Sequence, residues 1–241
     1  MTLDEILVSL FPAGHELELG PHGTMRGVGR RAEGVDVALV GVVDGTPVGV
    51  DAALWLAGRV LDVIEGRPAS PILMLVDSAS QNMTRRDELL GLNEYLAHLI
   101  KTLALAVSKG HRTVALLYGP AAAGAFIATS LSTEILAAIP GAQPSVMDLP
   151  SIARVTKLPI ENLTELSKST PIFAPGLEFL FATGAVSERW NIDIPLADQL
   201  ARALSEAAPE RDLRDEIGLE RKGRLEALGI ARRVVAEAAH A

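Results

Sequence analysis

Thr113-Val-Ala-Leu-Leu-Tyr118, followed at once by Gly119-Pro-Ala-Ala-Ala-Gly124-Ala-Phe-Ile-Ala-Thr-Ser130, is the stretch that decides the fold of this chain. Its first six residues are mostly apolar or β-branched, which predicts a buried strand, and the Gly-Pro pair ends that strand. The small residues that follow predict a tightly packed helix. The sequence therefore predicts a strand, a turn and a helix N-terminus in direct succession.

Such a junction aims unpaired backbone N–H groups at one point, beside the positive end of the helix dipole. An anion or a developing oxyanion could bind there, because residues 121–125 carry almost no side chain and a thioester or carboxylate could approach the main chain closely. The same small residues also fit a helix that merely packs against its sheet. The motif alone leaves both interpretations open.

The composition indicates a single domain over residues 1–241, with an N-terminal arm at 1–30 and a mainly helical tail at 177–241. No apolar run approaches the roughly 20 residues of a membrane helix. The N-terminal segment has acids where a signal peptide would carry bases. The chain has no cysteine, which excludes disulfides, a thiolate nucleophile and Cys-ligated metal. We therefore expect a cytoplasmic protein that neither enters a membrane nor binds a metal.

The formal net charge is −8, which argues against nucleic acid as the main partner, because nucleic acid is usually bound by a strongly basic face. His15 and His22 lie in a glycine-rich segment without a second ligand at metal spacing, so we leave both out of the site. Residues 11–31 read as an irregular arm or as short strands.

Upstream of the decisive stretch, residues 35–43 predict a strand, and Asp44-Gly45 is a strong hairpin signal with residues 47–50 as the return strand. Asp51 suits the N-cap of the next helix. Four apolar residues at helical spacing predict the buried face of that helix. They are Leu54, Ala57, Leu61 and Ile64.

Further along, residues 71–76 and 134–139 predict two more buried strands, and Thr84 begins a capping-box pattern ahead of a long helix. The apolar stripe of that helix consists of Leu92, Leu96, Leu99 and Leu103. Pro150 is well placed in the first turn of a later helix. Residues 177–183, 195–207 and 211–239 predict the helices of the tail.

Three segments in this order, Val37-Ala-Leu-Val-Gly-Val-Val-Asp-Gly-Thr-Pro-Val-Gly-Val50, Leu75-Val-Asp-Ser78 and residues 119–128, resemble the crotonase superfamily. Within it the chain is most similar to the carboxyltransferase branch of the biotin-dependent carboxylases over residues 30–200, and to the gamma subunit of malonate decarboxylase over the whole chain. The resemblance implies an α/β fold of the crotonase-like (ClpP/crotonase) type, built of repeated β-β-α units with a helical C-terminal region.

The resemblance also implies a site. The carboxyltransferase motif Tyr-Gly-Gly-Ala-Tyr falls on residues 122–126, so its Gly-Ala pair, whose backbone N–H groups form an oxyanion hole, corresponds to Gly124 and Ala125. The family stretch Val-Asp-Thr-Pro-Gly falls on residues 76–80. The implied substrate-lining residues are Ser78, Ala79, Ala122 and Ala123.

Two departures from the branch concern biotin. Its tyrosine and first glycine are Ala122 and Ala123 here, and an acidic residue that it often carries falls on Ile127. These changes agree better with a biotin-independent enzyme. The resemblance then implies decarboxylation of malonyl-S-acyl carrier protein to acetyl-S-acyl carrier protein and CO2, with negative charge on the thioester oxygen stabilised as an enolate.

The implied partners are a homologous beta subunit and the acyl carrier protein subunit. The carrier protein would supply a CoA-like phosphopantetheine arm, and the chain itself would bind no cofactor covalently. Sites of this type form between two crotonase-fold units, so this chain would supply half of one. The sequence leaves open which subunit provides the protonating acid.

Two other functions fit the sequence. The chain could present carboxybiotin to an acyl-CoA as a carboxyltransferase subunit, or it could be a scaffold that only stabilises its partner. A nucleophilic role for Ser78 is the weaker interpretation of that residue, because no histidine or lysine is evident nearby to activate it. Release of CO2 without biotin would separate the decarboxylase from the carboxyltransferase.

Overall fold

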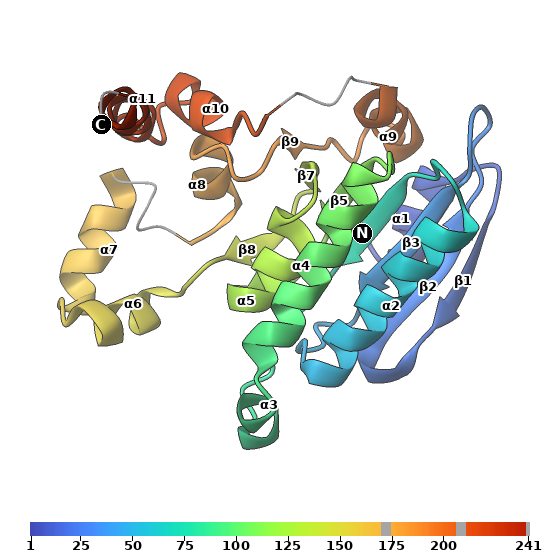
Figure 1. Ribbon diagram of the computed structural model, residues 1–241, viewed down its shortest axis with the longest axis horizontal. Coiled ribbons are helices and arrows are strands. Elements are labelled where there is room, and N and C mark those ends of the chain that lie inside the picture. The colour runs from blue at the N-terminus through green and yellow to red at the C-terminus, as the bar shows by residue number, and fades with distance from the viewer. Residues whose placement is uncertain (170–174, 206–210, 240–241) are drawn as a thin grey trace.

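The computed structural model describes residues 1–169, 175–205 and 211–239. Within these ranges a central sheet of seven strands has the order β1-β2-β3-β4-β5-β7-β9, and β6 and β8 form a small second sheet. The first three strands pair antiparallel, whereas the pairs from β3 to β9 are parallel. Figure 1 shows the sheet with helices in front of it and behind it.

The bounds of the elements are as follows. The strands are β1 (His15–Leu19), β2 (Thr24–Gly29), β3 (Val37–Val42), β4 (Ile72–Val76), β5 (Thr113–Leu117), β6 (Pro120–Ala122), β7 (Ile135–Ala138), β8 (Gln143–Ser145) and β9 (Glu188–Arg189). The helices are α1 (Leu3–Leu10), α2 (Val50–Gly66), α3 (Arg85–Leu89), α4 (Leu92–Ser108), α5 (Ala123–Phe126), α6 (Leu149–Thr156), α7 (Ile160–Ser169), α8 (Leu177–Ala182), α9 (Leu196–Ser205), α10 (Arg214–Glu220) and α11 (Ala227–Ala238). A 3-10 turn, η1 (Pro21–Gly23), precedes β2, and a π-helical turn, η2 (Ile127–Leu131), continues α5.

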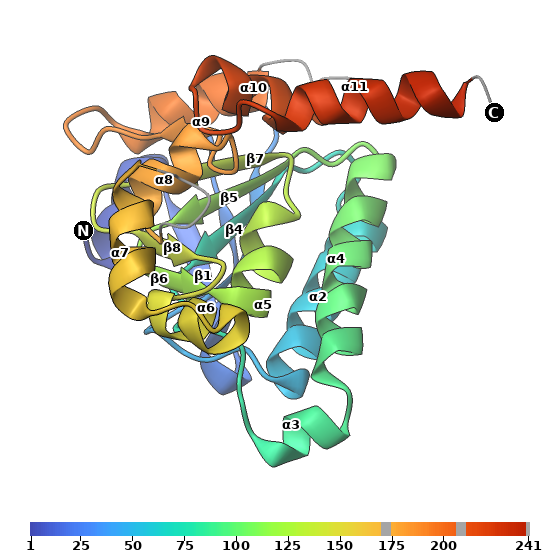
Figure 2. The same ribbon diagram turned by 90° about the vertical axis from the view of Figure 1, so that its left-hand side faces the viewer.

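The inner strands are apolar throughout because both faces of the sheet are covered. Every residue of β3, β4, β5 and β7 is buried. One apolar core lies between the sheet and helices α2, α4 and α5, and a second lies on the opposite face with α1, α9 and Trp190. Figure 2 shows α2 and α4 side by side along one face, with α11 projecting beyond the sheet. The buried strands predicted at 71–76, 113–118 and 134–139 are confirmed.

Each of the repeated units consists of a strand of the central sheet, a short extended segment in a second layer, and a helix. The units β5-β6-α5 and β7-β8-α6 are complete, because β6 and β8 pair with each other. In the two preceding units, which begin with β3 and β4, the second-layer segments pair only through a single parallel bridge between Val48 and Gln81. The expected crotonase-like plan of β-β-α units is present in this form.

The hairpin predicted at Asp44-Gly45 is wrong. Residues 47–50 do not return along β3, because β3 pairs with β2 on one side and with β4 on the other, which leaves no free edge. Val48 bonds instead to the segment after β4: its N–H donates to the Ser80 carbonyl at 2.8 Å, and its own carbonyl accepts from the Asn82 N–H at 2.9 Å. The turn residues are correct, but the strand that follows them belongs to the second layer.

One prediction for α2 is wrong and another is confirmed only in part. The N-cap is Gly49, and Asp51 lies inside the first turn, where its carboxylate pairs with Arg86. Of the predicted buried face, Ala57 is fully buried and Leu61 and Ile64 are half-buried, whereas Leu54 is 50% exposed. The buried face of the helix includes Ala53, Leu56, Ala57, Val60 and Val63.

The helix predictions after β4 are largely confirmed. Thr84 is the N-cap of α3, and the four leucines of the predicted stripe are buried in α4, although Gly91 in a left-handed conformation separates the two helices. Pro150 lies in the first turn of α6. Residues 11–31 hold β1 and β2, and the segment predicted as one helix from 211 to 239 is two helices. No helix in the described ranges has the length and apolar character needed to cross a membrane.

Candidate functional site

The backbone N–H of Gly124 donates a hydrogen bond to the side-chain oxygen Oε1 of Gln81 over 2.7 Å. Gly124 is the second residue of α5, and its N–H is one of those that a helix leaves without an internal partner. The predicted oxyanion donor thus points at an oxygen in this structure, and the oxygen belongs to a neighbouring carboxamide. Sequence analysis missed Gln81, which lies in a polar loop 43 residues away.

Gln81 is held in place through its main chain. The bridge to Val48 and the flanking hydrogen bonds of Ser80 and Asn82 fix residues 80–82 as part of the second layer. The other end of the carboxamide is held much less firmly, because Nε2 contacts only Sδ of Met83, at 3.6 Å, among the partners that the structure gives it. Met83 is 69% exposed. The backbone of Gln81 is therefore anchored, while its side chain has one strong hydrogen bond.

The turn that opens α5 is strained. Ala122 is extended, and Ala123 has φ = +54°, in the left-handed region that a side chain disfavours. The family motif carries glycine at the position of Ala123, and a positive φ explains that glycine physically. The π-helical turn η2 follows α5 directly, and turns of this type occur frequently at functional sites.

This strain gives a first prediction. Changing Ala123 to glycine removes the steric cost of the positive φ, about 1–2 kcal/mol, and increases the entropy of the unfolded state, which costs about 0.4–1 kcal/mol. The net gain is about 0.5–1 kcal/mol, so the melting temperature should rise by about 1–4 °C. Changing Ala122 to glycine is the matched control. Ala122 is already extended, so glycine relieves no strain there and only increases the entropy of the unfolded state, which lowers stability. Thermal melts of both variants check the expectation. Equal destabilisation of the two would show that Ala123 is not strained.

The segment after β4 lies against the segment after β5, as the sequence predicts. The Ser78 N–H donates to the Pro120 carbonyl at 2.7 Å, and a Cβ added at Gly119 would overlap the Asp77 carboxylate. Ser78 is fully buried and its Oγ has no hydrogen-bond partner in the described part of the chain, so a substrate could not reach it as a nucleophile in this conformation. Ala79, by contrast, is exposed.

An acid, Asp77, and a phenol, Tyr118, directly follow the strands β4 and β5. Burial raises the pKa of the Asp77 carboxyl, partly offset by a hydrogen bond from the Gly45 backbone. Burial and the Asp77 charge likewise raise the pKa of the Tyr118 phenol. Tyr118 Oη and Asp77 Oδ1 are both buried without partners among the described residues. These oxygens are shielded from solvent, although the Asp77 and Tyr118 side chains as a whole are half-buried.

A cavity of about 420 Å³ opens beside Gly124 and Gln81, between α4 and the start of α5. Apolar side chains dominate its wall. Its lining is Gln81, Asn82, Met83, Glu88, Leu92, Asn93, Leu96, Ala97, Ile100, Gly124 and Ile127. Of the six predicted site residues, Gly124 alone lines this cavity. Ala125 is fully buried beneath it, and Ser78, Ala79, Ala122 and Ala123 lie outside its wall.

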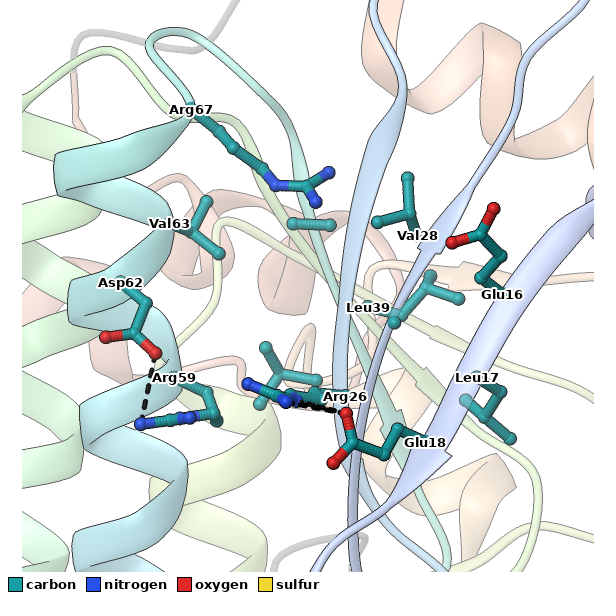
Figure 3. A pocket seen from close by; sticks show the side chains of 13 residues that line it. Glu16, Leu17, Glu18, Arg26, Val28, Leu39, Arg59, Asp62, Val63 and Arg67 are labelled. Atoms are coloured by element: carbon teal, nitrogen blue, oxygen red, sulfur yellow. Dashed lines mark hydrogen bonds and ion pairs between the residues drawn. The ribbon is translucent and has the colours of Figure 1, made fainter.

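A second cavity, of about 410 Å³, lies between α2 and the strands β1, β2 and β3 (Figure 3). Two ion pairs lie in its wall: Arg26 pairs with Glu18 at 2.6 Å, and Arg59 pairs with Asp62 at 3.0 Å. None of the predicted site residues lines it. The cavity beside Gly124 is therefore the candidate site.

The family model described as malonate decarboxylase gamma subunit matches residues 43–238 of this chain. The chain belongs to the malonate decarboxylase gamma subunit family. The match begins at the end of β3 and includes α5, the 78–83 loop and the helical C-terminal region. It confirms the family to which the motifs of the sequence pointed.

Solved structures agree with this membership. A Pseudomonas malonate decarboxylase hetero-tetramer in complex with coenzyme A contains a chain that is 25% identical, with a TM-score of 0.78 and coverage of 97% of both chains. A chain of the transcarboxylase 12S core matches at 16% identity with a TM-score of 0.67, over 87% of this chain and 42% of that one, which shows the shared fold alone. The crotonase-like fold is thereby confirmed for this member of the gamma-subunit family.

A curated relative carries a different activity in its name. The malonyl-S-ACP:biotin-protein carboxyltransferase of Malonomonas rubra is 33% identical over 150 residues, which are 58% of this chain and 51% of the relative. The chain thus spans about half the length of the curated relative it matches. The similarity to this relative is therefore a similarity of the matched 150 residues alone.

Proposed function

We propose that this chain is the subunit of a biotin-independent malonate decarboxylase that, with a homologous beta subunit, converts malonyl-S-acyl carrier protein to acetyl-S-acyl carrier protein and CO2. Membership of the gamma-subunit family supports the proposal. The similarity to a chain of a Pseudomonas malonate decarboxylase hetero-tetramer supports it as well. A cytoplasmic location, and a phosphopantetheine arm brought by the carrier protein, are parts of the same proposal.

The observation that carries the chemistry is the 2.7 Å hydrogen bond from Gly124 N–H to a carbonyl-type oxygen. Decarboxylation breaks the bond between C2 and the carboxyl carbon of the malonyl group, and the electron pair moves onto the thioester oxygen as an enolate. C2 then takes a proton. The task of the protein is to stabilise the oxygen while its charge develops.

The backbone N–H of Gly124, which lines the cavity, is proposed for that task. The family resemblance implies the N–H of Ala125 as a second donor, but Ala125 is fully buried in this structure, so the proposal rests on Gly124. One donor aimed at a developing oxyanion contributes about 3–4 kcal/mol to lowering a barrier, so no titrating side chain is required for this step. The apolar wall beside the donor lowers the local dielectric and strengthens the interaction. Ile127 contributes an apolar side chain to that wall at the position where the carboxyltransferase branch often has an acid.

The test is a decarboxylation assay with malonyl thioester. The chain alone should release no CO2, the mixture with the beta subunit should release it, and avidin should leave the rate unchanged. Activity of the isolated chain would contradict a shared site, and the absence of activity in both samples would favour the scaffold.

A second function has one specific observation in its favour. The carboxyltransferase from Malonomonas rubra is 33% identical to this chain over 150 residues, so transfer of a carboxyl group to a biotin protein is the competing activity. In the same assay this activity would appear as turnover that avidin abolishes. Ala123 and Ile127, which replace a glycine and an acid of the carboxyltransferase branch, favour the biotin-independent enzyme.

A further inference from the structure

The proposed oxyanion donor, the Gly124 N–H, already has a hydrogen-bond acceptor in this structure. Gly124 N–H is bound to Gln81, so a substrate oxygen that uses this donor must first displace the carboxamide. That displacement is feasible, because the remaining contact of the carboxamide is the weak one from Nε2 to the Met83 sulfur. A substrate oxygen that accepts the Gly124 N–H therefore replaces the Gln81 oxygen as the acceptor.

The exchange treats neutral and charged oxygens differently. A thioester carbonyl is a neutral acceptor like the Gln81 amide, so replacing one by the other yields little net free energy. An enolate oxygen forms a charge-assisted hydrogen bond, which is roughly twice as strong. The enolate therefore displaces the carboxamide when the thioester carbonyl does not.

We propose that Gln81 is a specificity-determining residue: its carboxamide covers the Gly124 N–H against neutral oxygens and gives way to an anionic one. The proposal rests on the proposed function. It means that the substrate does not gain this hydrogen bond in its ground state, whereas the enolate-like transition state does. Interactions of that kind raise the rate without tightening ground-state binding.

The placement of Gln81 fits such a cover. Its main chain cannot drift, because it is bonded in the second layer through Val48. Its side chain extends from this anchor along the wall of the 420 Å³ cavity that also contains Gly124. The carboxamide can thus leave the N–H by side-chain rotation while the loop stays where it is.

Two nearly isosteric variants test the proposal in the complex with the beta subunit. Gln81→Met removes the cover, so neutral oxygens gain the hydrogen bond. The complex should bind a non-reacting acetyl thioester about three- to tenfold more tightly, and kcat/KM for malonyl thioester should rise by a similar factor through a lower KM. Gln81→Glu puts a charged oxygen on the N–H, which an enolate no longer displaces, so kcat should fall about 100-fold.

Gln143→Met is the matched control, since Gln143 is an exposed glutamine of the second-layer strand β8 and does not line the cavity. Hydrogen exchange of the Gly124 amide, which should be faster in Gln81→Met than in the wild type, reports the cover independently of turnover. Weaker acetyl-thioester binding, or unchanged kinetics, in Gln81→Met would overturn the inference. A wild-type complex that releases no CO2 would instead overturn the proposed function beneath it.

Discussion

Replacing Gly124 with alanine should lower kcat for CO2 release from malonyl thioester by about 100-fold or more, the loss typical of one oxyanion donor. The reason is steric. A Cβ at this position would overlap the place where Oε1 of Gln81 sits and would lie 2.9 Å from Cδ1 of Leu96. Because that oxygen marks where a substrate oxygen accepts the N–H, the methyl group would exclude the substrate oxygen too.

The experiment needs to separate chemistry from assembly. Gly58→Ala is the matched control, because a Cβ on Gly58 in the middle of α2 would meet no atom within 4 Å. Gel filtration with the beta subunit should show the same complex for both variants, and steady-state kinetics should show the loss in Gly124→Ala alone. A Gly124→Ala complex that assembles and keeps full activity would contradict a catalytic role of the Gly124 N–H.

Replacing Asp87 with alanine should give the largest loss of stability, about 3 kcal/mol, or a melting temperature lower by about 6–12 °C. Asp87 is 2% exposed and accepts hydrogen bonds from the first turns of two helices. Its Oδ2 accepts from Asn82 Nδ2 and from Thr84 Oγ1, each at 2.7 Å, and its Oδ1 accepts from the Val50 N–H at 3.2 Å. Alanine would leave three donors without an acceptor.

Asp62→Ala is the control for this variant. Asp62 pairs with Arg59 at 3.0 Å on the surface of α2, and exposed ion pairs contribute little to stability. Thermal melts should therefore show a large shift for Asp87→Ala and nearly none for Asp62→Ala. Equal melting temperatures of the two variants would mean that the Asp87 network does not hold α2 and α3 together.

The sequence predicted the parts of the fold that rest on continuous apolar runs. β4, β5 and β7 are buried on both faces, so every residue in them contributes to the signal. The hairpin after Asp44 was wrong because local turn chemistry cannot reveal that β3 already has neighbours on both sides. The fold was therefore predictable where burial is complete, and misread where pairing depends on distant strands.

The site was predictable to a smaller extent. The run of small residues after β5 indicated residues 121–125 as a helix start that an anion could approach, and the family resemblance then pointed to Gly124. Gln81 had no such signal: one glutamine in a polar loop is ordinary, and its importance arises only when the second layer brings it to the N-terminus of α5. The strain at Ala123 could not be predicted from the residue type either, because alanine does not indicate a positive φ as glycine does.

The contact between α1 and α9 sets an order of events during synthesis on the ribosome. Ile6, Leu7, Leu10 and Phe11 belong to the core on the α9 side of the sheet, and Ser9 Oγ accepts a hydrogen bond from the Leu196 N–H at 3.0 Å, 187 residues away in the chain. Helix α1 thus cannot be completely buried until α9 has been synthesised and has emerged. Until then the nascent chain carries an exposed apolar segment at α1, and this segment is where chaperone binding or aggregation would begin.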